Sequence, residues 1–472
     1  FYASEYGAKL DSNVYTGGGT DDTDAIQRIL DKAPELGSVH LIVDGAALVT
    51  GLRVYSNTTI ECKNQSHGFF LKDNSNCPIL INANPNTETI IDKNITLLGG
   101  TYNENNQKQE GCRTQKDEKL DNALKKYKGS GIGKMVMTMQ LFGVENVLIR
   151  DLTLKDHRRW AFVCCNFKKI TMENIMIDLE HHIPNQNQDG LHFWGPGQYL
   201  TLKNIQGRTG DDFIALAPDE GDLESSITDV LIDGVILHEA DQGIRLLSRG
   251  TGLLDRVFIK NVVGTYKSFG FYVNCWFKGP GGNFGSIVFE NINLRPLESN
   301  YIEILDPFLF QIGGKMRHLV LRNINVDECD NRNILKFGYP FYNNRERDES
   351  DGLRSEYSTI KSVLIDGLHV EEKKADELQH PVIKITNPIE NLVIRDCEII
   401  RHKDSQSGGC FIELDKEARI DSLAINNVML KNVSKEIDVK SGTIKEILLS
   451  ETESAVRLEL TTSHIRVILK NM

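Results

Sequence analysis

Three aspartates stand at the starts of two consecutive strand-like runs. Asp189 precedes an apolar run that begins at Leu191, and the adjacent pair Asp211 and Asp212 precedes a run that begins at Phe213. Clustered carboxylates raise one another's proton affinity, so one of them can stay protonated near neutral pH. An acid beside a carboxylate that activates water is the arrangement that hydrolyses a glycosidic bond with inversion. We therefore expect Asp189, Asp211 and Asp212 to be catalytic.

A repeated phrase along the chain predicts the elements that would position these acids. The phrase is apolar–x–apolar, then Asn, Asp or a charged residue, then apolar–x–apolar, and its steps lie between 23 and 44 residues. Repeats of this length indicate stacked supersecondary units, and period-2 alternation indicates strands. The first apolar residue of each copy is Val147, Ile170, Leu200, Val230, Val257, Ile287, Leu319, Val363, Leu392 or Leu423.

A second set of strand-like runs lies between the copies of this phrase, so each coil offers at least two strands. Strands one coil apart would stack in parallel, about 4.8 Å from each other. The pattern predicts an all-β fold, a single-stranded right-handed parallel β-helix with a short N-terminal capping helix. A β-sandwich or a propeller is the alternative, but the repeat lacks the four strands that a propeller blade requires.

The stretch "GTDDTDAIQRILDKAPELG" predicts the cap as one amphipathic helix. Acidic residues crowd its first turn, which favours the helix dipole. Pro34 and Gly37 are expected to end it. Its apolar stripe consists of Ile26, Ile29, Leu30 and Ala33.

We expect one β-helix domain over residues 1–472, with the cap and the first coils in 1–50. Two polar stretches, 103–134 and 327–357, interrupt the repeat and are predicted to be loop insertions. Loops long enough to leave a solenoid usually wall a binding face.

Aligning the second strand set predicts which side chains share a face with the acids. The alignment uses Phe162, Leu191 and Phe213 and continues with Ile244 and Phe271. It makes Asp189 and Asp211 neighbours one coil apart, with Asp212 beside them. Aromatic rings stack on the apolar faces of sugars, and cations and amides bind anionic or hydroxylated groups. The predicted substrate-binding residues are Trp160, His192, Gln242, Arg245, Tyr272, Asn274 and Arg158.

The phrases "NQDG" and "TGDDFIAL" resemble the "NTDG" and "GDDCIAI" signatures of glycoside hydrolase family 28, the polygalacturonases and rhamnogalacturonan hydrolases. The stretches "YGAK", "DDTDAIQRILDKA" and "VTGLRVYSNTTIE" resemble the opening of the same pectinase β-helix superfamily, and the likeness covers roughly residues 5–300. The resemblance implies inverting hydrolysis without a metal or other cofactor. Carried over by position, Asp211 would be the general acid, while Asp189 and Asp212 would hold and activate the water.

Two family signatures differ here in ways that predict another substrate. The "GHG" signature falls on "DQG", which places Gln242 where the family has histidine, and "RIK" falls on "YVN", which places Tyr272 and Asn274 where the family has the arginine and lysine that grip a uronate. Arg245 stands where the family usually has a small residue and would supply a cation. We therefore expect a branched pectin, an unusual uronic-acid linkage or a terminal sugar as substrate.

Composition restricts the partners. The net charge of −12 argues against nucleic acid and anionic membrane surfaces as partners. The sequence contains no run of 18 apolar residues, so we expect no membrane-spanning helix. The expected partner is a polysaccharide or oligosaccharide, the expected location is secreted or periplasmic, and the sequence predicts no oligomeric state. The chain begins at Phe1 without a signal-like segment, so we expect a mature or trimmed chain.

Two alternatives remain open at this stage. A polysaccharide lyase or epimerase on the same fold would use the aspartates to bind calcium through oxygen ligands. A non-catalytic glycan-binding β-helix is favoured by the loss of the histidine and of the arginine–lysine pair.

Overall fold

The computed structural model describes the chain except for residues 115, 126–131, 185, 219, 221–223, 249, 275–281, 298–306, 328–332, 339–358, 376–379, 406–408, 417, 451–465 and 470–472. The chain forms two compact units, Phe1–Ala240 and Asp241–Met472. In the described residues, no helix is both long enough and apolar enough to cross a bilayer.

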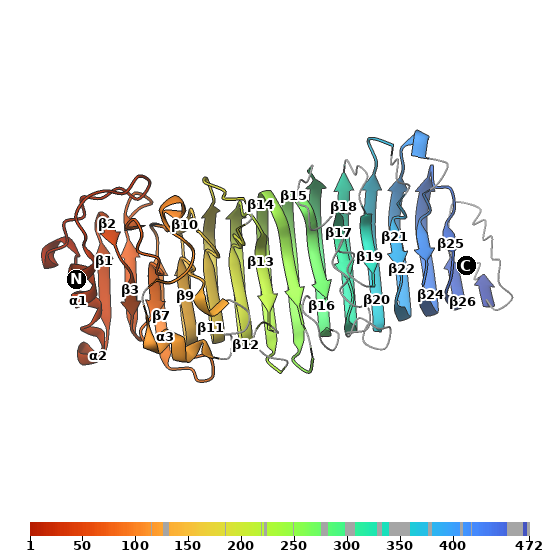
Figure 1. The fold of residues 1–472 in the computed structure, drawn as a ribbon. Helices are drawn as coiled ribbons and strands as arrows, with labels where there is room; N and C mark the ends of the chain where they lie inside the picture. Colours follow the sequence, from red (N-terminus) through yellow and green to blue (C-terminus); the bar gives the residue numbers. More distant parts are fainter. Residues whose placement is uncertain are drawn as a thin grey trace. The chain divides into compact units, whose positions relative to one another are not determined.

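In the part of the chain that the structure describes, the first unit contains short helices and thirteen complete strands, several of which are labelled in Figure 1. The helices are η1 (Ser4–Tyr6), α1 (Thr23–Leu30), α2 (Ala33–Leu36), η2 (Asn106–Lys108), α3 (Glu118–Ala123) and η4 (Ile132–Lys134). The strands are β1 (Val39–Val43), β2 (Ala46–Val49), β3 (Leu52–Val54), β4 (Thr58–Cys62), β5 (Gly68–Leu71), β6 (Leu80–Asn82), β7 (Asp92–Leu98), β8 (Thr101–Asn103), β9 (Met139–Arg150), β10 (Thr153–Lys155), β11 (Phe162–Asp178), β12 (Leu191–Gly207) and β13 (Asp212–Ala217).

Among its described residues, the second unit contains strands and the short helix η7 (Lys403–Ser405). Its strands are β15 (Leu254–Asn274), β16 (Asn283–Pro296), β17 (Phe308–Ile312), β18 (Lys315–Asp327), β19 (Asn333–Phe337), β20 (Ile360–Glu371), β21 (Ile383–Ile385), β22 (Pro388–Ile400), β23 (Ile412–Leu414), β24 (Arg419–Lys431), β25 (Ile437–Val439), β26 (Thr443–Ser450) and β27 (Arg466–Leu469). Strand β14 (Ile227–Leu247) begins in the first unit and ends in the second.

Strands of successive coils pair in parallel in each unit, and the pairing follows the repeat read from the sequence. Ile170 pairs with Val147 on one side and with Leu200 on the other, and Leu200 pairs with Val230. In the second unit the same columns join Val257, Ile287, Leu319, Val363, Leu392 and Leu423 in that order. Each unit is therefore a parallel β-helix, and the predicted coil repeat is confirmed.

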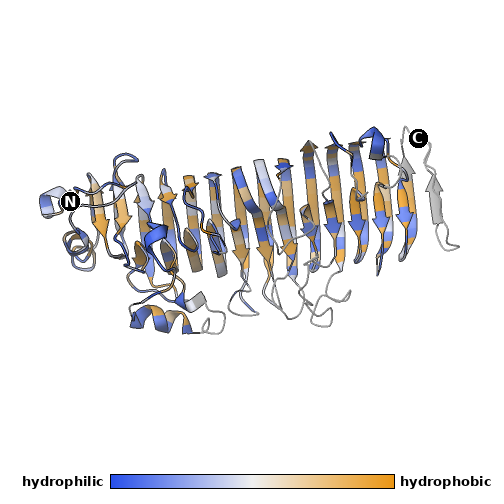
Figure 2. Cartoon of the chain, turned by 45° about the horizontal axis from the view of Figure 1, so that its top comes forward, coloured by the Kyte–Doolittle hydropathy of each residue, from blue (hydrophilic) through white to orange (hydrophobic). Residues whose placement is uncertain are grey.

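The apolar positions of the repeat form the inside of each coil. Ile170 and Leu200 are at most 1% exposed, and their neighbours at alternate positions face outward. Burying one such side chain stabilises the fold by roughly 1.5–3 kcal/mol. In the second unit, Phe271 of β15 pairs with Phe310 of β17, and their rings stack with centroids 4.6 Å apart. Figure 2 shows this alternation as hydrophobic and hydrophilic colours along the strands.

The middle residue of the repeat is Asn, Asp or Gly, and it marks a corner in each of the ten copies. It lies four residues after the first apolar residue and has a left-handed φ between 49° and 82° in all ten copies, at Asp151, Asn174, Asn204, Gly234, Asn261, Asn291, Asn323, Gly367, Asp396 and Asn427. Only glycine adopts this conformation freely, and Asn and Asp tolerate it best among the other residues. The composition of the repeat therefore follows from the backbone turn that each coil requires.

The N-terminal stretch is helical as predicted, but it forms two short helices instead of one. Ile26, Ile29, Leu30 and Ala33 are buried as expected. The stretch makes two helices, because α1 ends at Leu30 and Pro34 lies in the first turn of α2, where its missing N–H needs no partner. Gly37 ends α2 with a left-handed φ of 81°.

The two predicted insertions differ in what the structure describes. The described residues between 104 and 134 include η2, α3 and η4, and Asp117 accepts a hydrogen bond from the backbone N–H of Leu120 at the start of α3. Most of the predicted 327–357 insertion lies outside the described residues.

Candidate active site

The start of β13 sets the relative positions of the aspartates. Leu191 pairs with Ile214, and the backbone N–H of Gly190 donates to Asp212 O at 2.8 Å. Asp212 is therefore level with Asp189, and Asp211 precedes it by one position. The predicted alignment of Asp189 with Asp211 through Phe213 is wrong by one residue. Phe213 and Ile214 are both apolar, so the hydrophobic pattern alone did not distinguish their registers.

All three aspartates meet in one buried cluster. Oxygen atoms of Asp189, Asp211 and Asp212 lie within 4.8 Å of one another, and the three residues are 1%, 9% and 1% exposed. The side-chain amide of Asn187 donates to Asp189 Oδ1 at 3.0 Å and to Asp211 Oδ2 at 2.8 Å. Crowded carboxylates at low exposure repel one another, which favours retention of a proton by one of them. Such a cluster can supply both an acid and a base.

His192 connects this cluster to a fourth carboxylate. Its Nδ1 lies 2.7 Å from Asp189 Oδ2, and its Nε2 lies 2.8 Å from Glu220 Oε2. Burial alone would lower the pKa of the imidazole, but the charges and hydrogen bonds of Glu220 and Asp189 raise it to about 10. Glu220 carries no recognisable motif in the sequence, because only the fold brings it to His192.

Two tryptophans enclose the histidine. The ring of Trp160 stacks on His192 with centroids 3.7 Å apart and planes 3° apart, and its Nε1–H donates to Asn187 Oδ1 at 2.8 Å. Trp194 donates its indole N–H to Glu220 Oε2. Since Trp160 is 3% exposed, it supports the acids in this structure. A direct contact of Trp160 or His192 with a sugar stays a prediction.

Arg158 lies beside a second buried carboxylate. Its backbone N–H donates to Glu104 Oε2 at 2.9 Å, and Thr138 Oγ1 donates to the same oxygen at 2.6 Å. Glu104 is fully buried, which raises the pKa of its carboxyl to about 8 despite these hydrogen bonds. No motif in the sequence singles out Glu104, and the role of Arg158 in substrate binding stays a prediction.

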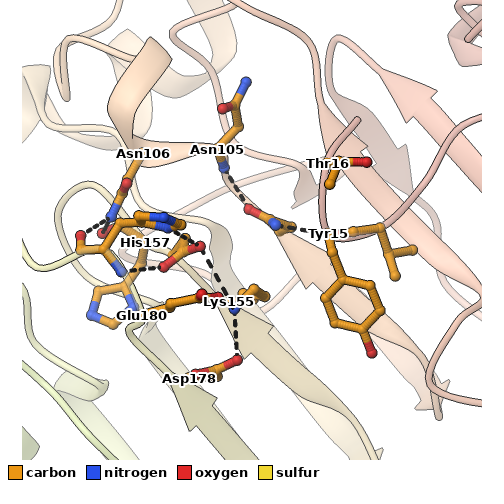
Figure 3. Close-up of polar contacts among 12 residues, drawn as sticks. Tyr15, Thr16, Asn105, Asn106, Lys155, His157, Asp178 and Glu180 are labelled. Carbon is orange, nitrogen blue, oxygen red and sulfur yellow. Dashed lines mark hydrogen bonds and ion pairs between the residues drawn. The ribbon is translucent and has the colours of Figure 1, made fainter. Parts of the chain in front are cut away.

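A separate polar cluster lies around Lys155 (Figure 3). The ammonium group is 2.7 Å from Asp178 and 2.7 Å from Glu180, while His181 Nδ1 lies 2.9 Å from Asp156 Oδ2. Burial lowers the pKa of Lys155, but its carboxylate partners raise it above the ordinary value. Asp156, Glu180 and His181 are close enough to hold a metal ion, and the ammonium of Lys155 lies beside two of these acids, 3.7 Å from Asp156 and 2.7 Å from Glu180.

The acids of another group are paired in the same way. Cys410, Glu413 and Asp438 in the second unit have possible ligand atoms within 4.8 Å of one another. Two ammonium groups lie close to Glu413, from Lys384 at 3.3 Å and from Lys440 at 2.6 Å. Neither this group nor the one around Lys155 was expected from the sequence.

The remaining predicted binding residues lie in the second unit. Arg245 donates to Gln242 Oε1, and its guanidinium lies 5.6 Å from the ring of Phe269 and 5.9 Å from that of Tyr272. Asn274 is fully buried and donates to the backbone carbonyl of Gly338 at 3.0 Å. The structure thus brings Gln242, Arg245 and Tyr272 together, and their contact with substrate stays a prediction.

Each unit is a parallel β-helix, and the first unit carries the buried cluster of Asp189, Asp211 and Asp212. Residues 121–302 match the model of "Glycosyl hydrolases family 28". This segment contains all three aspartates, and the resemblance to family 28 predicted from "NQDG" and "TGDDFIAL" is confirmed for a divergent sequence.

A curated relative and two solved structures give the extent of the likeness. The chain is 25% identical to an exopolygalacturonase of Oenothera organensis over 163 residues, which are 34% of this chain and 42% of that protein. The match thus spans about two fifths of the relative's length.

The solved structures concern the fold alone. A family 28 exopolygalacturonase of Yersinia enterocolitica has a TM-score of 0.51 and 13% identity, with 94% of this chain and 77% of that one covered. A tailspike protein of the E. coli bacteriophage HK620, in complex with a hexasaccharide, has a TM-score of 0.62 and 9% identity, with 96% and 74% covered. The predicted right-handed parallel β-helix is confirmed.

Proposed function

We propose that this protein is a polygalacturonase-like glycoside hydrolase that cleaves a pectic or other acidic polysaccharide by inversion. The observation that supports it most is the buried cluster of Asp189, Asp211 and Asp212, with oxygens within 4.8 Å and Asn187 bridging two of them. The match of residues 121–302 to family 28 supports the same class of reaction.

Asp211 is proposed to protonate the glycosidic oxygen as the bond to the anomeric carbon breaks. Asp189 and Asp212, which are level in neighbouring strands, hold a water molecule on the opposite side of the sugar and accept its proton. The hydroxyl bonds to the anomeric carbon, so the product has the inverted configuration. Most inverting enzymes separate their carboxyl groups by about 6.5–9.5 Å. Because the oxygens here approach more closely, the stereochemistry of the product is a direct test.

The substrate is proposed to differ from ordinary polygalacturonan. Gln242, Tyr272 and Asn274 occupy positions where the family signatures have histidine, arginine and lysine. The family's uronate-binding cations are therefore replaced, and Arg245 is the cation that we propose for an anionic group of the sugar. A branched pectin, an unusual uronic-acid linkage or a terminal sugar fits this set.

Two other functions make different predictions. In a lyase or epimerase, the carboxylate cluster would bind Ca²⁺, a cation that prefers oxygen ligands, and activity would depend on that ion. A non-catalytic glycan-binding protein would retain a glycan without cleaving it. The likeness to a tailspike crystallised with a hexasaccharide shows the fold only.

We propose a secreted or periplasmic location, because an extended acidic polysaccharide does not cross a membrane. The proposed partner is the polysaccharide or an oligosaccharide of it.

The decisive experiment is a screen of pectic and other acidic glycans for release of reducing ends and for ultraviolet absorbance. Wild-type protein is compared with Asp211→Asn, with and without a chelator, and NMR follows the anomeric configuration of the first product. Reducing ends that require Asp211 and ignore the chelator support the hydrolase. Ultraviolet-absorbing products that vanish with the chelator indicate a lyase, and glycan binding without turnover indicates a binding protein.

A further inference from the structure

Glu220 and His192 lie behind the cluster of aspartates. Both nitrogens of the imidazole face carboxylates, with Nδ1 at 2.7 Å from Asp189 and Nε2 at 2.8 Å from Glu220. All three residues are at most 9% exposed. Ionised carboxylates only accept hydrogen bonds, so a ring between two of them donates from both nitrogens and is an imidazolium. The same geometry fixes the orientation of the ring.

The surroundings of the ring strengthen this arrangement. Trp160 covers one face of His192 in a parallel stack, and a cation over an aromatic face is stabilised. Trp194 donates to Glu220, which holds that carboxylate in place. Among the described residues, the charged groups within hydrogen-bond distance of the imidazole are Asp189 and Glu220. The attraction between a buried cation and two buried anions is stronger than that between exposed charges, because water and salt screen it less.

We propose that Glu220 and His192 are positioning residues that keep Asp189 ionised and correctly oriented toward the reacting water. The proposal rests on the assignment of Asp189 as a water-activating carboxylate. An adjacent cation lowers the pKa of a carboxyl by about 1–3 units, which offsets the repulsion from Asp211 and Asp212. Glu220 has a different task, because its negative charge keeps His192 protonated at the pH of the reaction.

The pH profile of kcat/KM tests this role. In His192→Gln the cation is lost, so the acid limb of the profile, which reports the ionisation of the base, is expected to move up by about one unit. The variant then loses roughly tenfold in kcat/KM below that limb. In Glu220→Gln the imidazole loses one anionic partner, so the pKa of His192 is expected to fall.

A spectroscopic measurement tests the protonation of His192 between Asp189 and Glu220 independently of activity. The ¹⁵N spectrum of labelled protein reports the protonation of the His192 ring, with His192→Gln to assign the signals. We expect both ring nitrogens to carry protons at pH 7 in wild type, and the pKa to fall by at least one unit in Glu220→Gln. If no glycan is cleaved, the proposed function fails. These spectra still decide whether Glu220 keeps the ring of His192 protonated.

The control is a histidine–glutamate pair of similar geometry on the surface. His40 Nε2 lies 2.8 Å from Glu61 Oε2, and the imidazole is 54% exposed. His40→Gln is expected to leave the pH profile of kcat/KM unchanged. A neutral His192 ring in wild type at pH 7 would overturn the proposal, as would a folded His192→Gln variant whose acid limb coincides with that of wild type.

Discussion

Asp189 and Asp212 occupy equivalent positions in neighbouring coils, while Asp211 stands one residue outside that column. The backbone carbonyl of Asp189 accepts from Ala161 N–H at 2.9 Å, and that of Asp212 accepts from Gly190 N–H at 2.8 Å, one step further along the same ladder. The three acids therefore divide into a level pair and a single residue. This division suits a reaction in which two carboxylates share one water and a third acts on the leaving group.

The division predicts different behaviour for the asparagine variants. Asp211→Asn should lose roughly 100- to 10,000-fold in kcat on the natural glycan, because general acid catalysis contributes about that much. An aryl glycoside with a good leaving group needs no acid, so it should restore much of the activity of Asp211→Asn. The same substrate should not restore Asp189→Asn or Asp212→Asn. Equal rescue of all three variants would contradict the assignment.

Asn187 is predicted to hold the two kinds of acid at their working distance. Asn187→Ala removes the amide that donates to Asp189 and Asp211 and the oxygen that accepts from Trp160. We expect kcat to fall by roughly ten- to a hundredfold with little change in KM, and unfolding free energy to fall by about 1–3 kcal/mol. Steady-state kinetics and denaturant unfolding measure both quantities.

The control for Asn187 is the exposed turn residue Asn64, whose Oδ1 accepts from the backbone N–H of Ser66 at 2.9 Å. Asn64→Ala should leave kcat unchanged. A folded Asn187→Ala variant with the kcat of wild type would show that the bridge is dispensable.

The coil repeat could be predicted from the sequence because two structural requirements of each coil select residue types that can be recognised in the sequence. The inside of the coil demands apolar side chains at alternate positions, and the corner demands Asn, Asp or Gly. The pairing of Ile170 with Leu200 follows from these demands. The register of β13 against β12 could not be predicted in this way. Phe213 and Ile214 are both apolar, so either could have paired with Leu191, and the structure pairs Ile214 with it.

The candidate site could be predicted only in part. Asp189, Asp211 and Asp212 are recognisable because they stand in short phrases at strand starts. Glu220 and Glu104 have no such phrase, and their importance arises from burial and from partners distant in sequence, His192 and Thr138. The sequence carries no direct signal for the burial of a single charged residue in a loop.

Glu104 should make stability depend on pH. Its carboxyl has an ordinary pKa of 4.5 and a pKa of about 8 in the folded protein, because burial disfavours the charged form. The folded state therefore binds more protons than the unfolded state between these values, and stability falls as pH rises through this window. The full effect is about 3–5 kcal/mol.

Thermal unfolding of Glu104→Gln between pH 5 and pH 8 measures this effect. The variant has no carboxyl to ionise, so its Tm should decline less than that of wild type over the same range. Glu61→Gln is the control, because the pKa of Glu61 is lowered chiefly by its hydrogen bond to Lys63, and this residue lies on the surface. An identical decline in wild type and Glu104→Gln would show that another group carries the dependence.

The left-handed backbone at the coil corners predicts that two variants of Asn291 differ in stability. This residue has a φ of 57°, and its amide donates to Asn261 Oδ1 at 3.0 Å while its oxygen accepts from Asn323 at 2.8 Å. Asn291→Gly loses both hydrogen bonds but keeps the turn, whereas Asn291→Ala also forces an alanine into the left-handed region. We expect Asn291→Ala to be less stable than Asn291→Gly by about 1 kcal/mol, as measured by denaturant unfolding.

The reverse change at another corner completes the test. Gly367 has a φ of 78°, and a Cβ added there would lie 3.6 Å from the nearest backbone atoms of Asn323, which is ordinary contact. Gly367→Asn should therefore be tolerated, while Gly367→Ala should be destabilising although it is smaller. Size would then not be the cause of the difference. If Gly367→Ala proves as stable as Gly367→Asn, the left-handed corner does not explain why Asn, Asp and Gly recur at this position in the ten copies of the repeat.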